Sequence, residues 1–366
     1  MISVLKKALD TVLGAGEAAV TVPPLDGAFQ PNTALEAAAA LAALPAPDNL
    51  VREGDRILLS CGADVLAWTG EGTQPVARFS APVSALAADD RAGLAVALAG
   101  QGLVLQRAGA PERTVAATAF AGAGCITAMA FAPDGGLIVT CGSRRHGPDD
   151  WARNLLERAC DGAVWRIDPA SGEARRIAGG LGWPAGLLVG DDGTVVVSEA
   201  WRHRLVALPA AGGAPKVLAD NLPAYPGRLV RQGAEIWLCC FAPRSQLMEF
   251  VLREKTFRTR MVAEVPAAFW VAPALASGRS FREPLQGGAV KQLGVLKPWA
   301  PTRSYGLLVC LDTDFHPRRS FHSRADGSRH GITSVLPAGD GVLVTSRGGD
   351  VLLRLAAATT RAEDAR

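Results

Sequence analysis

Residues whose types and spacing could support catalysis are few in this chain of 366 residues. The sequence has no G-x-S-x-G nucleophile motif, phosphate-binding glycine loop, dinucleotide fingerprint or H-E-x-x-H zinc motif. Of its five histidines, His330 lies just before a predicted strand, where its imidazole could act as a general base near neutral pH. The other interpretation is a solvated loop histidine, because the preceding segment 323–329 is polar.

Three further polar residues are candidates for contacts in a substrate pocket. Tyr225 and Tyr305 are the only tyrosines, and each could either line a pocket or pack in the core. Glu199 could contact a substrate, but an ion pair with the nearby Arg204 is the favoured interpretation. None of these residues identifies a reaction on its own.

The seven cysteines favour neither a disulfide framework nor a zinc site. Their number is odd, two of them are adjacent, and no C-x-x-C spacing occurs. Such usage is typical of a reduced chain with small buried thiols. The N-terminal stretch contains two lysines and Asp10, so we expect no signal peptide, and no apolar run is long enough to span a membrane. We therefore expect a soluble cytoplasmic protein.

Composition limits the class of partner. The 38 basic and 35 acidic residues nearly balance, and no block of five like charges occurs, so nucleic acid and anionic membranes are not expected partners. Hydrophobic residues make up 49% of the chain and charged residues 20%, which is enough to build a large core and excludes a disordered chain. A small-molecule ligand is the partner that remains.

The first 46 residues are expected to form a helical extension. Apolar residues within 3–13 recur on one helical face, which predicts a short amphipathic helix. It could dock on the body of the protein or on a second copy, or lie on a membrane surface. An alanine-rich segment near 33–44 predicts a second helix.

From residue 47 onward a turn followed by a short apolar strand recurs six times. The six copies are residues 54–61, 91–98, 133–141, 191–199, 232–240 and 339–346. Each copy is followed by a second apolar strand, and all spacings but one are roughly 40–60 residues, which suits four-stranded propeller blades. We predict an all-β fold, a six-bladed β-propeller over 47–356 with a flexible tail over 357–366. A β-sandwich is the alternative, but six similar units are too many for one sandwich.

Two insertions interrupt the repeats. Residues 144–162 predict a short helix over the third blade. Residues 242–302, in the fifth blade, predict a helix from Ser245 to Arg260 and then an irregular stretch rich in proline and glycine. Long loops in a compact repeat fold often form lids, so we expect the second insertion to cover a mouth of the channel.

Three segments resemble blades of a known family. Residues 182–208, 219–244 and 331–355 are similar to the central, the following and the closing blade of strictosidine synthase-like proteins. That family belongs to the propeller superfamily of gluconolactonase, regucalcin and paraoxonase. The most specific pieces are Asn221-Leu222-Pro223 with Tyr225-Pro226, and Ser198-Glu199-Ala200 with Arg204. The resemblance covers roughly 47–355 and implies a ligand site at the channel mouth.

Calcium-dependent relatives hold the ion at this mouth with carboxylate and amide oxygens. The resemblance places ligands in 184–186, after Pro226, and in 125–128, but in this chain these positions offer Ala185, Gly227 and no Asn. Only Asp48 or Asn49 could still donate an oxygen to the axis. Because calcium takes six to eight oxygen ligands, we expect no metal and no other cofactor at this site.

Residues at the mouth are the candidates for the site. Asp48 and His330 are the catalytic candidates, with Trp183 and Asn49 as pocket residues. Arg228, after the small Gly227, could bind the carboxylate of an anionic ligand, unless it forms a structural ion pair.

The predicted function is hydrolysis of a small ester or lactone in the axial pocket. A non-catalytic binding or scaffold propeller, which could form a homo-oligomer, is the alternative. Synthase chemistry that forms a C–N bond is a further alternative. The resemblance places the synthase carboxylate near Thr333, however, and no Asp or Glu lies between Asp326 and Asp340.

Overall fold

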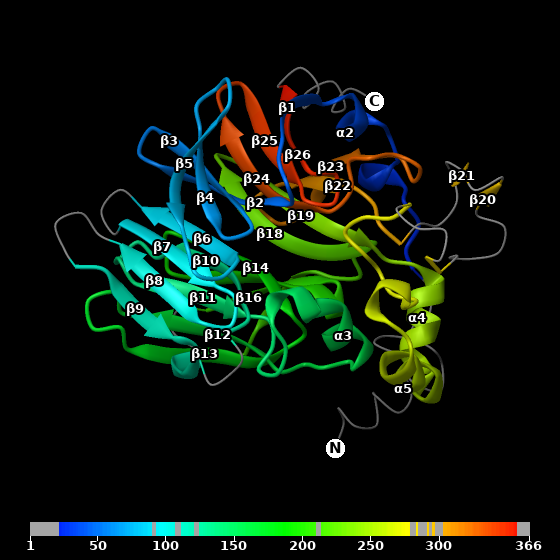
Figure 1. The fold of residues 1–366 in the computed structure, drawn as a ribbon, viewed down its shortest axis with the longest axis horizontal. Coiled ribbons are helices and arrows are strands. Elements are labelled where there is room, and N and C mark those ends of the chain that lie inside the picture. The colour runs from blue at the N-terminus through cyan, green and yellow to red at the C-terminus, as the bar shows by residue number, and fades with distance from the viewer. Residues whose placement is uncertain are drawn as a thin grey trace.

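Six sheets of four antiparallel strands surround a common axis in the computed structural model, so the predicted six-bladed propeller is confirmed (Figure 1). The structure describes residues 22–89, 93–106, 111–120, 124–209, 214–278, 283–284, 291–292, 295–296 and 303–356. The amphipathic helix expected over 3–13 and the tail expected over 357–366 lie outside these residues. The first strand of each blade contacts the first strand of the next, and that of the sixth contacts that of the first, so the ring is closed.

In every blade the first strand lies at the axis and the fourth at the outer edge. In this order the first three blades contain β2 (Pro47–Glu53), β3 (Arg56–Cys61), β4 (Asp64–Trp68) and β5 (Thr73–Arg78); β6 (Val83–Asp89), β7 (Gly93–Leu98), β8 (Gly102–Gln106) and β9 (Arg113–Ala116); and β10 (Ile126–Phe131), β11 (Leu137–Cys141), β12 (Gly162–Ile167) and β13 (Ala174–Leu181). The last three contain β14 (Pro184–Val189), β15 (Val195–Glu199), β16 (Arg204–Leu208) and β17 (Lys216–Ala219); β18 (Ala224–Gln232), β19 (Glu235–Pro243), β22 (Leu307–Leu311) and β23 (Pro317–His322); and β24 (Ile332–Ala338), β25 (Gly341–Ser346), β26 (Val351–Ala356) and β1 (Ala39–Ala43).

The six repeated copies in the sequence are the second strands of the blades. Strands such as β11 and β15 are buried along their whole length, because the neighbouring blades cover both faces of the sheet. This is why they appear in the sequence as continuous apolar runs. Two-residue turns join first and second strands in blades 1, 5 and 6, and Gly54, Gly233 and Gly339 supply the positive φ that such turns need, 57°, 59° and 61°.

The N-terminal part of the chain completes the last blade. Strand β1 pairs antiparallel with β26, with Ala39 opposite Arg354 and Ala43 opposite Val351 (Figure 1). The alanine-rich helix predicted near 33–44 is therefore wrong for most of its length, since only α2 (Ala34–Ala37) is helical. Alanine favours a helix locally, but the outer edge of β26 would otherwise lack a hydrogen-bonding partner. The propeller thus includes a strand that precedes the predicted start at residue 47.

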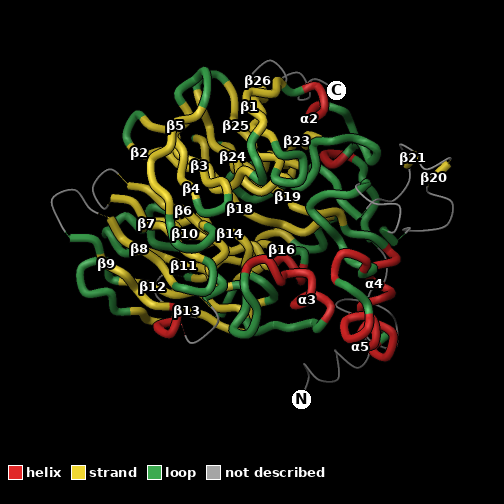
Figure 2. Tube along the Cα trace, in the orientation of Figure 1, coloured by secondary structure: helices red, strands yellow, loops and turns green. Residues whose placement is uncertain are grey.

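Helices occur mainly in the two predicted insertions. Between β11 and β12, the helices η4 (Pro148–Asp150) and α3 (Trp151–Leu156) confirm the first. Between β19 and β22, α4 (Gln246–Arg253) is capped by Ser245, whose hydroxyl accepts the Met248 N–H. The predicted single helix is interrupted at Glu254, which has a non-helical backbone, and continues as α5 (Lys255–Glu264). Figure 2 shows these helices gathered on one side of the strands. The shorter elements are η2 (Gly27–Phe29), η3 (Ala117–Phe120), η5 (Ala200–Arg202), η6 (Ala267–Phe269), β20 (Lys291–Gln292) and β21 (Val295–Leu296).

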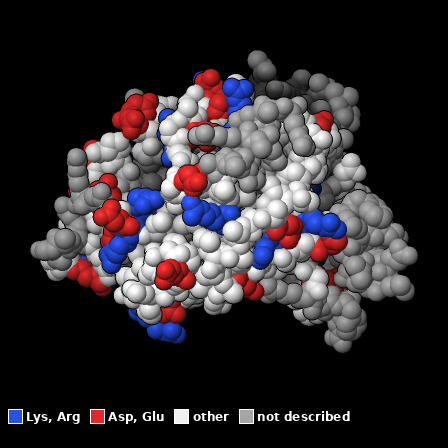
Figure 3. Space-filling model, turned by 90° about the horizontal axis from the view of Figure 1, so that it is seen from above, with Lys and Arg blue, Asp and Glu red and all other residues white. Residues whose placement is uncertain are grey.

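The apolar core lies between neighbouring blades, as expected for sheets that cannot bury both faces alone. All seven cysteines are described, none forms a disulfide, and only Cys160 is exposed. No described helix has the length and apolar character that crossing a membrane requires. On the face in Figure 3, basic and acidic side chains lie in small neighbouring groups.

Candidate active site on the propeller axis

The six innermost strands share an irregularity near their first residues. In blades 2, 3, 4 and 6 the pairing with the second strand skips one residue, and these residues are Ser84, Thr127, Ala185 and Thr333. In blades 1 and 5 the pairing skips two residues, 49–50 and 227–228. A bulged residue is left out of the ladder of backbone hydrogen bonds, so its carbonyl oxygen is available for other contacts.

The guanidinium of Arg228 lies where these carbonyl groups converge. Its Nη1 atom donates to Asp48 Oδ1 at 2.6 Å and to the Thr333 carbonyl oxygen at 3.1 Å. Its Nη2 atom donates to the carbonyl oxygens of Ser84 and Thr127 at 3.0 and 3.1 Å. Four of the five guanidinium N–H groups are thus bonded to oxygen atoms of four different blades.

Carbonyl oxygens of the other two blades accept hydrogen bonds from hydroxyl groups. Ser198 donates to the Gly227 carbonyl at 2.8 Å, and Thr127 donates to that of Pro184, the residue before the bulged Ala185. Blades 4 and 5 also approach closely at this point, because a Cβ atom added to Gly186 would lie 2.2 Å from the Gly227 oxygen. The described hydrogen bonds of the Arg228 guanidinium go to the remaining four blades.

Asp48 is the carboxylate of this site. It is buried, and besides Arg228 its Oδ1 atom accepts the backbone N–H of Asn49 at 2.8 Å. Its Oδ2 atom lies 3.7 Å from Nη1 of Arg347, a residue of the turn between β25 and β26. One oxygen of Asp48 is thus fixed by two donors, while the other faces a second arginine.

A cavity of about 100 Å³ opens onto the Asp48–Arg228 pair. Its apolar wall contains Trp151 of α3, Trp183 before β14, and Phe241 of β19. The rings of Trp151 and Phe241 meet edge to face at a centroid distance of 5.4 Å. Aromatic walls with a few convergent polar groups are typical of small-molecule sites.

The rim of the cavity contains a second Asp–Arg pair. Arg347 Nη2 donates to Asp149 Oδ1 at 3.1 Å, which joins blade 6 to the insertion of blade 3. Both side chains are accessible, with exposed fractions of 34% for Arg347 and 72% for Asp149. Ser84 also lines the cavity, but its hydroxyl oxygen is buried and has no hydrogen-bond partner among the described residues. Arg347 and Asp149 are therefore the polar groups that a ligand can reach.

Three residues singled out by the sequence, Asp48, Arg228 and Trp183, meet at this cavity. Two polar residues that the sequence did not single out, Asp149 and Arg347, join them there. A signal for the axis was present in the sequence: second strands of four blades carry a hydroxyl residue near their end. These residues are Ser60, Thr140, Ser198 and Thr345. Three of them donate to a carbonyl of the innermost strand of their own blade, and Ser198 donates to that of the next blade, at Gly227.

His330 does not line the cavity. It is buried, and both ring nitrogens have partners: Nδ1 lies 2.7 Å from Ser304 Oγ, and Nε2 lies 2.8 Å from the Arg324 carbonyl oxygen. Burial lowers the pKa of this imidazole. Tyr305 also lies outside the lining, with its hydroxyl 3.1 Å from Nδ1 of His322. Burial raises the pKa of Tyr305 to about 12.

The other predicted pocket residues also lie outside the lining. Tyr225 is fully buried and packs on Trp201, and burial raises the pKa of its hydroxyl. Glu199 is fully buried, and it pairs with Arg204, as the sequence favoured, and with Arg202. Asn49 is buried and donates to Ser60 Oγ at 2.8 Å.

The residues at the axis do not fit a calcium ion. The oxygen atoms that converge there are already bonded to a positively charged guanidinium, which fills the position an ion would take. A second cation at this point would be repelled by Arg228. We therefore derive no metal-assisted step at this site.

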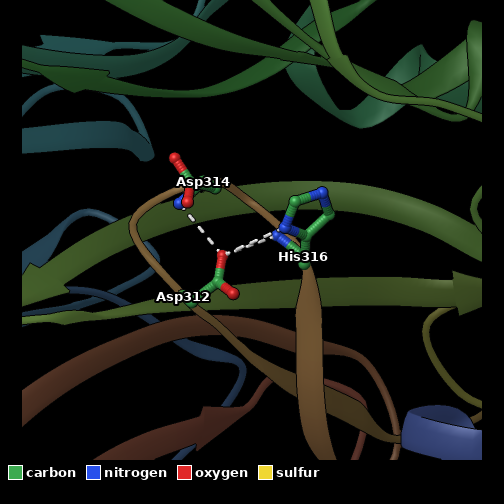
Figure 4. A group of neighbouring side chains, drawn as sticks. All are labelled: Asp312, Asp314 and His316. Atoms are coloured by element: carbon green, nitrogen blue, oxygen red, sulfur yellow. Dashed lines mark hydrogen bonds and ion pairs between the residues drawn. The ribbon is translucent and has the colours of Figure 1, made fainter.

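A separate group of potential metal ligands lies in the surface turn between β22 and β23 (Figure 4). It consists of Asp312, Asp314 and His316. The Oδ1 atom of Asp312 accepts the backbone N–H groups of both other residues at 2.9 Å. These bonds lower the pKa of Asp312. The hydrogen bonds of the turn explain why these three residues lie close together, and we assign the cluster no ligand.

Comparisons with known proteins support the fold. No protein-family model matches the chain, and no curated protein matches its sequence. Among solved structures, a gluconolactonase from Xanthomonas campestris is similar with a TM-score of 0.52 and 14% identity, over 87% of each chain. Regucalcin from Agrobacterium tumefaciens, a calcium-binding protein, is similar with a TM-score of 0.55 and 13% identity, over 87% of this chain and 92% of its own. At identities this low, the structural similarity shows a shared fold, the six-bladed propeller, and no more than that.

Proposed function

We propose that the axial cavity binds a small organic metabolite and hydrolyses an ester or lactone bond in it without a metal ion. The observation that carries this proposal is the environment of Asp48. Arg228 and the Asn49 N–H fix one carboxylate oxygen, so the other is held in place beside the cavity. A carboxylate fixed in this way can take a proton from a water molecule that attacks the substrate carbonyl, and can return this proton to the alcohol oxygen as the C–O bond breaks.

Arg347 supplies the complementary charge. Its guanidinium lies near the free oxygen of Asp48 and lines the same cavity. A donor in this position can stabilise the negative charge that develops on the carbonyl oxygen during attack. The aromatic wall would hold the apolar part of the substrate. The fold shared with a gluconolactonase supports the proposal by analogy alone, because one fold hosts many activities.

Ligand binding without turnover is the second candidate function. It is favoured by the composition of the lining, since no imidazole lines the cavity among the residues that the structure describes. The two candidates predict different results in one experiment. Trp151 and Trp183 line the cavity, so binding of a ligand should change the tryptophan fluorescence whether or not turnover follows.

The test is a panel of lactones and aryl esters assayed with the wild-type chain, Asp48→Asn, and the surface variant Asp340→Asn as control, since Asp340 pairs with Arg354 outside the cavity lining. We expect kcat to fall roughly 100- to 10,000-fold in Asp48→Asn with little change in KM, and to stay near the wild-type value in Asp340→Asn. Circular dichroism at the assay temperature confirms that each variant is folded. Full activity of folded Asp48→Asn would overturn the mechanism. A fluorescence response without turnover in the wild type would instead support the binding function.

A further inference from the structure

The contacts of Arg228 resemble the coordination of a metal ion more than the binding of a ligand. Three backbone carbonyl oxygens and one carboxylate oxygen, from blades 1, 2, 3 and 6, converge on its two terminal nitrogen atoms. We propose that Arg228 is an internal cation that replaces an axial metal ion, and that removing its side chain creates a site for calcium on the axis.

The electrostatics of the axis require a positive charge. The negative ends of three carbonyl dipoles and the buried Asp48 carboxylate point at one place, and they repel one another without a cation between them. Leaving a buried carboxylate without its partner is strongly unfavourable. In this chain the fifth blade supplies the charge covalently, so stability does not depend on the concentration of a free ion.

The bulges explain why the oxygen atoms remain suited to an ion. Ser84, Thr127 and Thr333 are all left out of the strand pairing, and their positions are set by the ladders on either side. A shorter side chain at position 228 would therefore leave these oxygens in place, facing an empty centre.

The vacated site would favour calcium over magnesium. Calcium accepts six to eight oxygen ligands in flexible geometry. The chain offers four oxygens, and water can supply the others from the adjoining cavity. Magnesium demands near-ideal octahedral geometry and gives up its water reluctantly, so an irregular set of carbonyls suits it poorly.

A second buried arginine provides a matched control. Arg303 is also buried and donates to the backbone carbonyls of Ala272 and Ala268 at 3.2 and 3.1 Å. The charge of Glu283 acts on Arg303, but the described hydrogen-bond partners of Arg303 include no carboxylate and only two carbonyl oxygens. Its removal should therefore cost hydrogen bonds without exposing a site for a cation.

The experiment compares the thermal unfolding of the wild-type chain, Arg228→Ala and Arg303→Ala in EDTA, in millimolar calcium and in millimolar magnesium. We expect both variants to unfold at lower temperature than the wild type in EDTA. Calcium should raise the midpoint of Arg228→Ala by several degrees, magnesium should raise it by less, and the other two proteins should not respond. A calcium response of the wild type, an equal response of Arg303→Ala, or none in Arg228→Ala overturns the proposal.

Two additions keep the test decisive. If Arg228→Ala does not fold in EDTA, refolding from urea with calcium replaces the melting experiment, and recovery with calcium supports the proposal while failure in both buffers overturns it. The double variant Asp48→Asn/Arg228→Ala lacks the charged ligand and should lose the calcium response. An undiminished response would place the ion elsewhere. These readouts are independent of turnover, so the proposed hydrolysis can fail while this inference stands.

Discussion

Two Asp–Arg pairs contact the same cavity and differ in what surrounds them. Asp48 and Arg228 lie 2.6 Å apart, with side chains that are 10% and 19% exposed. Asp149 and Arg347 lie 3.1 Å apart and are 72% and 34% exposed. Arg228 has four of its donors bonded to the protein, whereas Arg347 keeps donors that water can reach. Arg228 is thus a structural residue, whereas Arg347 is accessible to a ligand.

Solvent accounts for this difference. Water screens the exposed pair, so its net contribution to stability is small and a ligand can displace either partner at little cost. The buried pair has lost its water, so each charge depends on the other. An anionic ligand should therefore bind at Arg347, where the sequence had suggested Arg228.

The largest expected effect separates the two aspartates. Asp48→Asn removes the charge that balances Arg228 and should lower the free energy of unfolding by about 3–5 kcal/mol. Asp149→Asn should lower it by less than about 0.5 kcal/mol. Urea unfolding of both variants measures the difference. Similar losses would show that the two pairs are energetically alike and would remove the basis of the comparison.

Low pH should weaken the whole fold, so the pairs must be compared above about pH 6.5. Burial lowers the pKa of the His322 imidazole from 6.5 to about 4. The unfolded chain therefore takes up a proton as the pH falls through 6.5, while the folded chain does so only near 4. Stability present above pH 6.5 is lost between these values, by on the order of 3 kcal/mol for this residue.

Urea unfolding across that range measures the slope, and His322→Gln should flatten it. The slope should not vanish, because burial also lowers the pKa of His203 and His330. A slope unchanged by His322→Gln would contradict the assignment to this residue.

Two glycines test packing at the axis against packing at the rim. A Cβ atom on Gly186 would lie 2.2 Å from the Gly227 oxygen and 2.6 Å from Arg228 Cα, so Gly186→Ala should cost about 1–3 kcal/mol. Gly147, two residues before Asp149, has no atom within 4 Å of the position that a Cβ would take, and Gly147→Ala should change stability by less than about 0.5 kcal/mol. Chemical unfolding of both variants gives the comparison. Tolerance of alanine at 186 would mean that blades 4 and 5 can separate there.

The smallest effect on stability is expected for Arg347→Gln, below about 0.5 kcal/mol. Its effect on binding should be larger, because the variant loses the accessible positive charge. For a substrate with a carboxylate group we expect KM or Kd to rise about tenfold, and for its uncharged amide to stay nearly constant. Titration of both compounds measures this. An equal change for the two would exclude Arg347 as the anion-binding residue.

The sequence predicts the propeller well because its strongest signal comes from strands buried on both faces. Strands such as β11 and β15 appear as apolar runs after a turn, and they recur in all six blades. Strand β1 could not be predicted in this way. Its alanines favour a helix locally, and only its distant partner β26 decides otherwise.

The site is predicted in part. Asp48, Arg228 and Trp183 lie near the starts of innermost strands, where the repeat and the family resemblance could locate them. Arg347 and Asp149 belong to a turn of one blade and an insertion of another, and ring closure brings them together. The role of Arg228 depends on carbonyl groups freed by bulges, which no side-chain pattern records.

The closing pair of strands also has a consequence for how the protein is made. The partners Ala39 and Arg354 are roughly 300 residues apart in the chain. During synthesis β1 leaves the ribosome before the other strands of the propeller and must wait for β26, which follows them. Contacts between such distant segments form slowly. Until β1 and β26 pair, the unpaired edges of these two strands can pair with another chain. The yield of native protein should therefore fall as the local concentration of nascent chains rises.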